Sequence, residues 1–82
     1  MIKILFLKTN VLLITRIEEV PSELGEPDCK LIKPFVIAET GLVPWMCDFT
    51  SQTELMIHSD SILTIVDPNR TYLDKYQSLT AE

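Results

Sequence analysis

The residues with the clearest chemical potential stand next to one another in one polar stretch. His58, the single histidine, is followed by Ser59, Asp60 and Ser61. Histidine, serine and aspartate can form nucleophilic or acid–base machinery, and an imidazole can also stack on or hydrogen-bond a nucleobase. Neighbours in a tight turn rarely converge as a triad, and no further group that would orient His58 is apparent. We therefore expect no catalytic residues and no enzymatic activity, and we treat the stretch as a candidate binding site.

The two cysteines, Cys29 and Cys47, each stand alone inside an apolar run. No Cys-x-x-Cys spacing is present, which argues against a zinc or redox motif. We expect both to be buried thiols in a reducing compartment, with a single bridge between them as the alternative. The acidic side chains within residues 18–28 could attract a divalent cation, but their spacing matches no known calcium loop. A solvated acidic face is the default, so we expect no metal and no cofactor.

Composition restricts both the size of the core and the class of partner. The 82 residues are 46% hydrophobic, so we expect a single domain over residues 1–82, near the lower size limit for one core. The 7 Lys and Arg against 12 Asp and Glu give a formal net charge of −5. Such a field repels phosphate backbones unless the few cations gather on one surface. Residues 1–7 are apolar but too short for a signal peptide or a membrane span, so we expect a cytoplasmic protein without membrane contact.

Alternation of apolar and polar residues predicts that the polar stretch lies between strands. The apolar runs 55–57 and 62–66 flank it, which is the pattern of strand, tight turn and strand. The same alternation recurs along most of the chain. The predicted strands cover about residues 2–8, 11–20, 29–39, 43–57 and 62–66.

Turn-forming residues mark the predicted connections. Thr9 and Asn10 form a plausible two-residue turn, because Asn tolerates positive φ. Residues 21–28 contain Pro, Gly and acids, which predicts a surface loop. Pro34 cannot donate to a ladder, so it marks a bulge or an edge position. Residues 51–54 are either a turn or a kink within the fourth strand.

The end of the chain is predicted to be a short amphipathic helix at about residues 68–79. Asp67 would be its N-cap and Pro68 its first helical residue. Tyr72 and Tyr76 stand one turn apart and would dock the helix on the sheet. The fold class predicted from all these elements is mainly β, a small five-stranded, strongly bent antiparallel barrel with a short C-terminal helix.

The last predicted strand also predicts self-association. No Lys or Pro interrupts the edge of this strand. Its apolar side chains lie on both faces and are Ile62, Leu63, Ile65 and Val66. Pairing this edge with the fourth strand of a neighbouring copy would satisfy the backbone and bury the side chains. Such a contact is head-to-tail and closes into a homo-oligomeric ring of about five to eight subunits if the rotation permits.

Residues 56–62 resemble a known family signature. They read Met-Ile-His-Ser-Asp-Ser-Ile and resemble the second signature of Sm-like proteins, a hydrophobic residue and Ile before a basic residue and Gly, then two residues and another Ile. The hairpin of residues 2–20 is similar to the first hairpin of that family, with its long bent second strand. The segments 26–29, 33–35 and 62–65 resemble small Sm-like proteins encoded by phages of marine bacteria, cyanophages among them. The likeness spans about residues 2–66 and implies an Sm-like (SH3-like) barrel.

The resemblance further implies a ring that binds single-stranded RNA or acts as an RNA chaperone, in the host cytoplasm if the gene belongs to a phage. The RNA-binding candidates are polar or basic residues of two turns and one strand: His58, Ser59, Asp60, Thr9, Asn10, Lys30 and Lys33. In a ring, His58 from every subunit would form a pH-sensitive set around the pore. Lys30 and Lys33 alternate with apolar residues and would share a face, as phosphate contacts or simply as solvated lysines.

Two departures from the family keep a second function open. The Asp-x-hydrophobic-Asn signature that binds RNA bases has no match in residues 21–28, and the basic residue and Gly are replaced at 58 and 59. A structural or protein-interaction ring that has lost RNA recognition is therefore the alternative. Trp45 and Phe49 could form a stacking platform, although their alternating positions favour a core or interface role.

Overall fold

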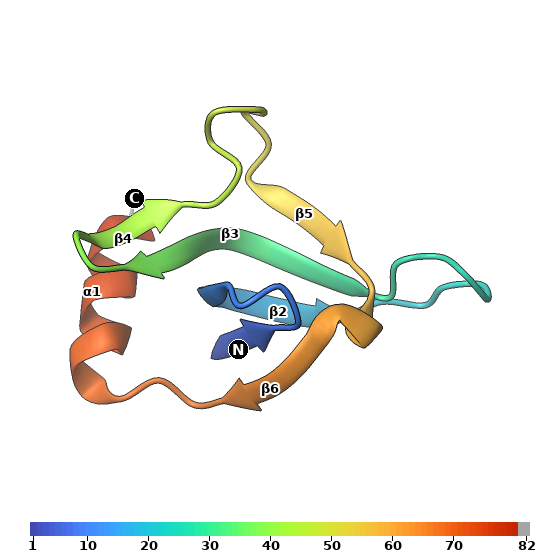
Figure 1. Cartoon of the computed structure of the whole chain (residues 1–82), viewed down its shortest axis with the longest axis horizontal. Helices are drawn as coiled ribbons and strands as arrows, with labels where there is room; N and C mark the ends of the chain where they lie inside the picture. The colour runs from blue at the N-terminus through green and yellow to red at the C-terminus, as the bar shows by residue number, and fades with distance from the viewer. Residues whose placement is uncertain (81–82) are drawn as a thin grey trace.

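A computed structural model describes residues 1–80 as an antiparallel sheet of 6 strands followed by one helix (Figure 1). The elements in chain order are β1 (Ile2–Leu7), β2 (Leu12–Glu19), β3 (Cys29–Ala38), β4 (Gly41–Pro44), β5 (Glu54–Ile57), the 3₁₀ turn η1 (Ser59–Ser61), β6 (Ile62–Val66) and α1 (Arg70–Thr80). The prediction of a mainly β, antiparallel fold with a short C-terminal helix is confirmed. No helix among the described residues is long and apolar enough to cross a membrane.

The sheet is open rather than closed into the predicted barrel. Its strand order is β4-β3-β2-β1-β6, and β5 pairs with the first half of β3 while β4 pairs with the second half. Within residues 1–80 no pairing joins β5 to β6, and each of these strands has one partner only. Figure 1 shows why, because β5 and β6 diverge from η1 toward opposite sides of the molecule.

A bulge bends the centre of the sheet, as the position of Pro34 predicts. Ile14 pairs with Phe35 but Arg16 pairs with Ile32, so Lys33 and Pro34 together face a single residue of β2. Lys33 has a φ of 51°, the left-handed conformation found at bulges. The bend lets the two halves of β3 serve different neighbours.

The predicted fourth strand at 43–57 is wrong in its middle part. Residues 45–53 leave the sheet as a projecting loop, here called the excursion loop, which rises at the top of Figure 1. Its backbone turns at Met46, whose φ of 64° is left-handed, and the Phe49 and Thr50 N–H groups donate to the Met46 carbonyl. Cys47 and Phe49 are therefore exposed, contrary to the prediction of a buried thiol and a core or interface aromatic.

The main core lies on one face of the sheet. Leu5, Leu7, Leu13 and Leu31 are buried there, and all come from positions that alternate along β1, β2 and β3. Trp45 packs against this cluster from the base of the excursion loop. Cys29 is buried, as predicted.

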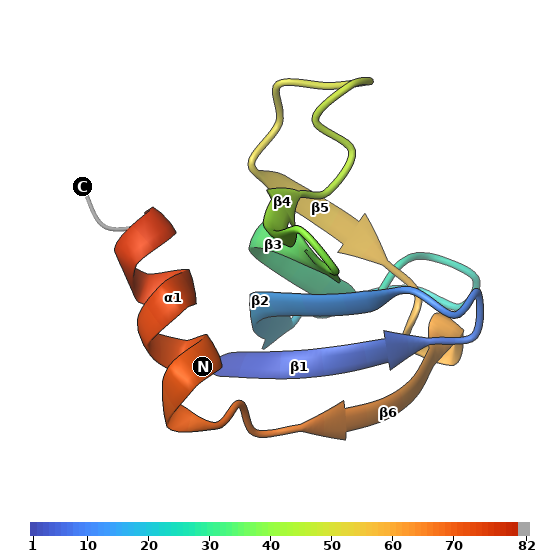
Figure 2. The same cartoon turned by 60° about the vertical axis from the view of Figure 1, so that its left-hand side comes forward.

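Helix α1 docks at one end of the sheet (Figure 1 and Figure 2) through Tyr76, which is fully buried. The Tyr76 hydroxyl lies 2.9 Å from the carbonyl oxygens of both Ile32 and Lys33 and accepts the Arg16 N–H at 3.3 Å. This confirms the predicted docking role of Tyr76, whereas Tyr72 is only partly buried. Figure 2 shows α1 upright beside the end of the sheet where β1 begins.

The predicted start of the helix is wrong by two residues. Asn69 is the cap, because its side-chain oxygen accepts the Tyr72 N–H at 3.0 Å and α1 begins at Arg70. Asp67 instead forms an ion pair with Lys3 of β1. Asp67 therefore does not cap α1.

Candidate functional site

The predicted binding residues of the polar turn line a recess with the loop between β2 and β3. The volume of this acidic recess is about 380 Å³. Its lining comes from both segments: Ser22, Glu23, Leu24, Gly25, Glu26, Asp28, His58, Ser59 and Asp60. The structure thus brings His58, Ser59 and Asp60 together.

A two-point contact ties the polar turn to the loop. The backbone N–H and the Oγ of Ser59 each donate to the Asp28 carboxylate at 2.7 Å. These hydrogen bonds, led by that from the Ser59 hydroxyl, lower the pKa of Asp28. Ser61 closes the turn, since its N–H and Oγ both donate to the His58 carbonyl. The donors of Ser59 are therefore already used within the protein.

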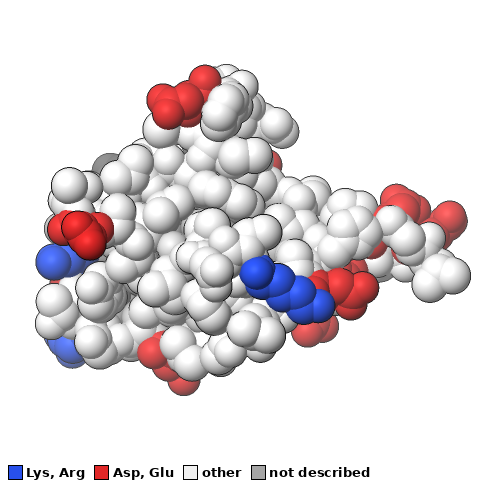
Figure 3. Space-filling view, in the orientation of Figure 1, with Lys and Arg blue, Asp and Glu red and all other residues white. Residues whose placement is uncertain are grey.

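The charge of the recess is unfavourable for a phosphate. Its lining includes four carboxylates, from Glu23, Glu26, Asp28 and Asp60, and no lysine or arginine of the described residues. Figure 3 shows acidic side chains gathered around the protruding loop at the right of the molecule. Such a surface repels an RNA backbone and attracts cationic groups.

Thr9 and Asn10 lie in the turn between β1 and β2 and not in the recess. The predicted turn is confirmed, with Asn10 at a φ of 65°. The adjacent Lys8 N–H donates to the Ser61 carbonyl at 2.9 Å, so the two turns are neighbours. They present separate surfaces rather than one pocket.

The two candidate lysines are directed to different partners. Lys30 forms an ion pair of 2.7 Å with Glu54 of β5, and the hydrogen bond within that pair raises the pKa of Lys30. The Lys33 Nζ donates to the Thr80 carbonyl at 3.3 Å, at the end of α1. Neither lysine lines the acidic recess.

The predicted interface strand β6 has an exposed apolar surface. The exposed fractions of Leu63, Ile65 and Val66 are 59%, 51% and 47%, respectively. Ile62 differs because it packs against the core cluster. The burial expected for both faces of this strand is therefore not achieved within one chain. On the opposite edge, Met56 of β5 is 46% exposed.

Comparison with known families places the chain in one of them. The model of a family of unknown function, DUF6561, matches residues 1–81. The chain belongs to DUF6561. No curated protein matches it. Among its described residues, no group of three or more His, Cys, Asp or Glu side chains is placed to hold a metal ion.

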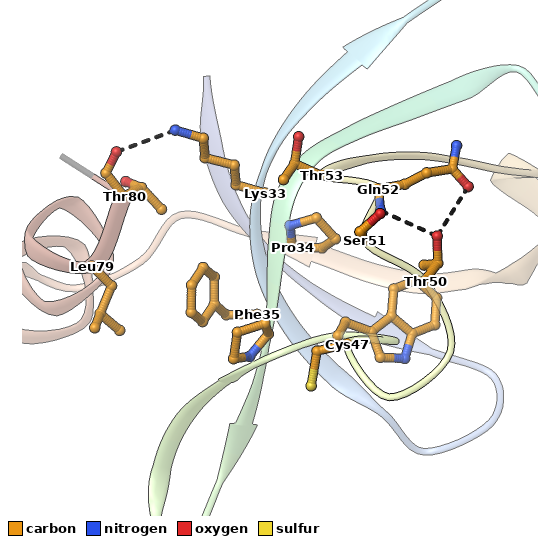
Figure 4. Close-up of a pocket in the computed structure, with 12 residues that line it drawn as sticks. Lys33, Pro34, Phe35, Cys47, Thr50, Ser51, Gln52, Thr53, Leu79 and Thr80 are labelled. Carbon is orange, nitrogen blue, oxygen red and sulfur yellow. Dashed lines mark hydrogen bonds between the residues drawn. The ribbon is translucent and has the colours of Figure 1, made fainter. Parts of the chain in front are cut away.

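This DUF6561 chain has a second concavity that the sequence did not indicate. The aromatic groove, of about 410 Å³, lies between the excursion loop and the end of α1 (Figure 4). Its lining comes from three parts of the chain: Lys33, Pro34, Phe35, Pro44, Trp45, Cys47, Thr50, Ser51, Gln52, Thr53, Leu79 and Thr80. Trp45 was noted in the sequence as an aromatic with stacking potential. Its partners could not be found without knowing that residues 45–53 leave the sheet.

Proposed function

We propose that the protein is an Sm-like subunit that assembles into a homo-oligomeric ring through its two free strand edges. The observation that carries this proposal is the pair of edges itself. Among the described residues, β5 pairs only with β3 and β6 only with β1. The outer edge of β6 displays exposed Leu63, Ile65 and Val66 without any gatekeeper Lys or Pro, and such edges pair with other chains.

The placement of the two edges suits a head-to-tail contact. In Figure 1, β5 and β6 lie on opposite sides of the molecule, and β5 runs toward η1 whereas β6 runs away from it. A copy that is both displaced and rotated would bring its β6 beside β5 in antiparallel orientation. Heterologous contacts of this kind close into rings when the rotation between copies divides a full turn.

The energy of such a contact is favourable for a small domain. Burying two Ile-sized side chains contributes roughly 3–6 kcal/mol before association costs are subtracted. Leu63, Ile65 and Val66 on one edge and Met56 on the other provide at least that much apolar surface. The backbone groups of both edges would gain hydrogen bonds at the same time.

The role of the ring has two candidates. RNA binding at the polar turn is supported by the Sm-like resemblance and by the recess that residues 58–60 form with the preceding loop. A protein-interaction ring is favoured by the four carboxylates of that recess and by the Asp28 contact that occupies Ser59. On electrostatic grounds we favour the interaction ring at this particular surface.

Light scattering tests the ring, and an RNA titration tests its role. We expect an oligomer for the wild-type protein and a smaller species for Val66→Lys, which places a charge on the β6 edge. Leu24→Lys, in the loop between β2 and β3, is the matched control because Leu24 is fully exposed away from both edges. A monomeric wild-type protein would overturn the proposal. If His58→Ala lowers the affinity for RNA, the polar turn is the RNA-binding surface.

A further inference from the structure

We propose that the aromatic groove is a docking site for Phe49 of a second copy of this chain, in a two-fold contact that does not use the free strand edges. Phe49 lies on the excursion loop and is 83% exposed, so its ring does not fill the groove of its own chain. An exposed aromatic side chain beside an apolar groove is an anchor and a pocket on one molecule. Such a contact gives Phe49 the interface role that its alternating position in the sequence favours.

The turn of the excursion loop presents Phe49 in an ordered conformation. The Phe49 and Thr50 N–H groups donate to the Met46 carbonyl at 3.0 and 3.1 Å, respectively. Met46 is 42% exposed and adds apolar surface on the same turn. Because hydrogen bonds already hold this backbone, docking of the turn costs little conformational entropy.

The groove offers apolar walls from β3, the excursion loop and α1. Its volume of about 410 Å³ is that of a pocket able to enclose a small ligand. Phe35 is held by Tyr76, with ring centroids 5.8 Å apart, and Trp45 is held by the buried leucine cluster. Figure 4 shows Phe35 between Leu79 of α1 and the residues of the excursion loop. A phenyl ring needs only close apolar contact with such walls and no continuous stacking surface.

The charges beside the anchor and in the groove are complementary. Asp48 precedes Phe49 and is exposed, whereas none of the described residues that line the groove is an Asp or Glu. Among these lining residues the one charged side chain is Lys33, whose Nζ also donates to the Thr80 carbonyl at 3.3 Å. Docking of Phe49 carries the Asp48 carboxylate toward this positive charge, which favours the approach. This match between anchor and groove is the reason for assigning the groove to a second copy.

The anchor and the groove are neighbours, which suits a two-fold contact. Phe49 directly precedes Thr50, the first of the loop residues 50–53 that line the groove. A two-fold axis beside the loop therefore places each Phe49 in the groove of the other copy. One buried phenylalanine removes about 150–250 Å² from water, so two anchors and two grooves bury roughly 600–1,000 Å². Standard interfaces bury at least about 1,200 Å², so this contact is weak for two chains and gains strength where several chains are already assembled.

Sedimentation velocity in a Val66→Lys background tests this contact apart from the ring. Val66→Lys damages the β6 edge, so a dimer that forms in this protein needs another surface. We expect a monomer at about 10 μM and a shift toward a dimer by about 1 mM, as for a contact of this small area. Adding Phe49→Ser should abolish the dimer, and adding Leu24→Ser, at an exposed position elsewhere, should not. A monomer at every concentration, or a dimer that Phe49→Ser leaves intact, would overturn the proposal.

Disulfide trapping tests whether Phe49 meets the groove. Phe49→Cys and Leu79→Cys are made in separate proteins, at positions that are 83% and 54% exposed and lie outside the core. Each protein also carries Val66→Lys and Cys47→Ser, so that the new cysteine is the one exposed thiol among the described residues. The Leu79→Cys protein keeps its Phe49, so a mixed pair retains one anchor.

Oxidation of the mixture with diamide gives the result. A disulfide forms only where two Cα atoms approach within about 7 Å, so we expect the linked dimer to form faster in the mixture than in either protein alone. A mixture of Leu79→Cys with Leu24→Cys is the control and should react slowly. Equal rates in the two mixtures would overturn the assignment of Phe49 to the groove. The ring proposal is independent of this result, because it is tested on the strand edges.

Discussion

Asp28 and Ser59 are 31 residues apart in the chain, yet two hydrogen bonds of 2.7 Å join the carboxylate of one to the backbone and side chain of the other. This contact is the junction between the β2–β3 loop and the polar turn. It holds η1 at the corner from which β5 and β6 diverge. The geometry of both free edges therefore depends on a contact at the surface.

The Asp28 contact predicts a specific pH dependence. Because Ser59 lowers the pKa of Asp28 below its ordinary value of 3.8, the folded state favours the carboxylate. The resulting stability is fully present above that ordinary value and is lost as the pH falls through the lower pKa of the folded state. Asp28→Asn should therefore show a smaller loss of stability between pH 5 and pH 2 than the wild-type protein. Urea unfolding across this range measures it, and parallel curves for the two proteins would contradict the assignment.

The buried hydroxyl of Tyr76 predicts a stability effect of its own. Removing it in Tyr76→Phe leaves the Arg16 N–H and two carbonyl oxygens without this partner, which should lower the free energy of unfolding by about 1–3 kcal/mol. Tyr72→Phe is the matched control on the same helix and should have almost no effect. Urea denaturation of both variants makes the comparison. Equal stabilities would mean that the ring of Tyr76 alone docks the helix.

Tyr76 also predicts how the protein responds to alkali. Burial raises the pKa of Tyr76 above its ordinary value of 10.0. The stability that comes from the neutral hydroxyl is complete below that value and is lost as the pH rises through the higher pKa of the folded state. Tyr76→Phe should remove this part of the alkaline destabilisation. The measurement is the urea unfolding midpoint of each protein at neutral and at alkaline pH. If both proteins lose the same stability between the two pH values, the assignment is wrong.

The sequence predicted the features that follow from local chemistry. Asn10 marked the first hairpin turn and Pro34 the bulge, because one tolerates left-handed backbone and the other cannot donate to a ladder. The alternation in β1, β2 and β3 identified the strands that bear the core. The amphipathic pattern around Tyr76 identified the docking helix.

The features that the sequence missed depend on distant contacts. Val43, Trp45, Cys47 and Phe49 alternate as in a strand, but the left-handed turn at Met46 ends that strand. Cys47 and Phe49, which follow the turn, are exposed, and so is Val43. Asp67 stands at an N-cap position in the sequence, but in the structure it forms an ion pair with Lys3, which is far away in the chain. The aromatic groove needs the excursion loop and α1 together.

The two cysteines should differ sharply in reactivity. Cys47 is exposed on the excursion loop, whereas Cys29 is buried and its pKa is raised by burial and by the nearby carboxylates of Asp28 and Glu19. The thiolate is the reactive form, so a disulfide reagent at pH 8 should modify Cys47 rapidly and Cys29 slowly under native conditions. Cys47→Ser should lose the fast phase and keep the slow one. Two equally fast phases would mean that Cys29 is accessible.

The proposed ring contact makes a prediction about mixed variants. Val66→Lys damages the β6 edge but leaves β5 intact, whereas Met56→Lys damages the β5 edge but leaves β6 intact. In a head-to-tail ring, either variant alone should be monomeric because every contact needs both edges. An equimolar mixture has one undamaged pair of edges, so we expect a heterodimer that cannot grow further.

Sedimentation velocity of each variant and of the mixture measures these species. A 1:1 complex that appears only in the mixture requires β5 of one chain to meet β6 of another. A contact between two β6 strands would give a different pattern, since Met56→Lys would then associate normally by itself and Val66→Lys would not be rescued. Leu24→Lys, which leaves both edges intact, should behave as the wild-type protein in every combination.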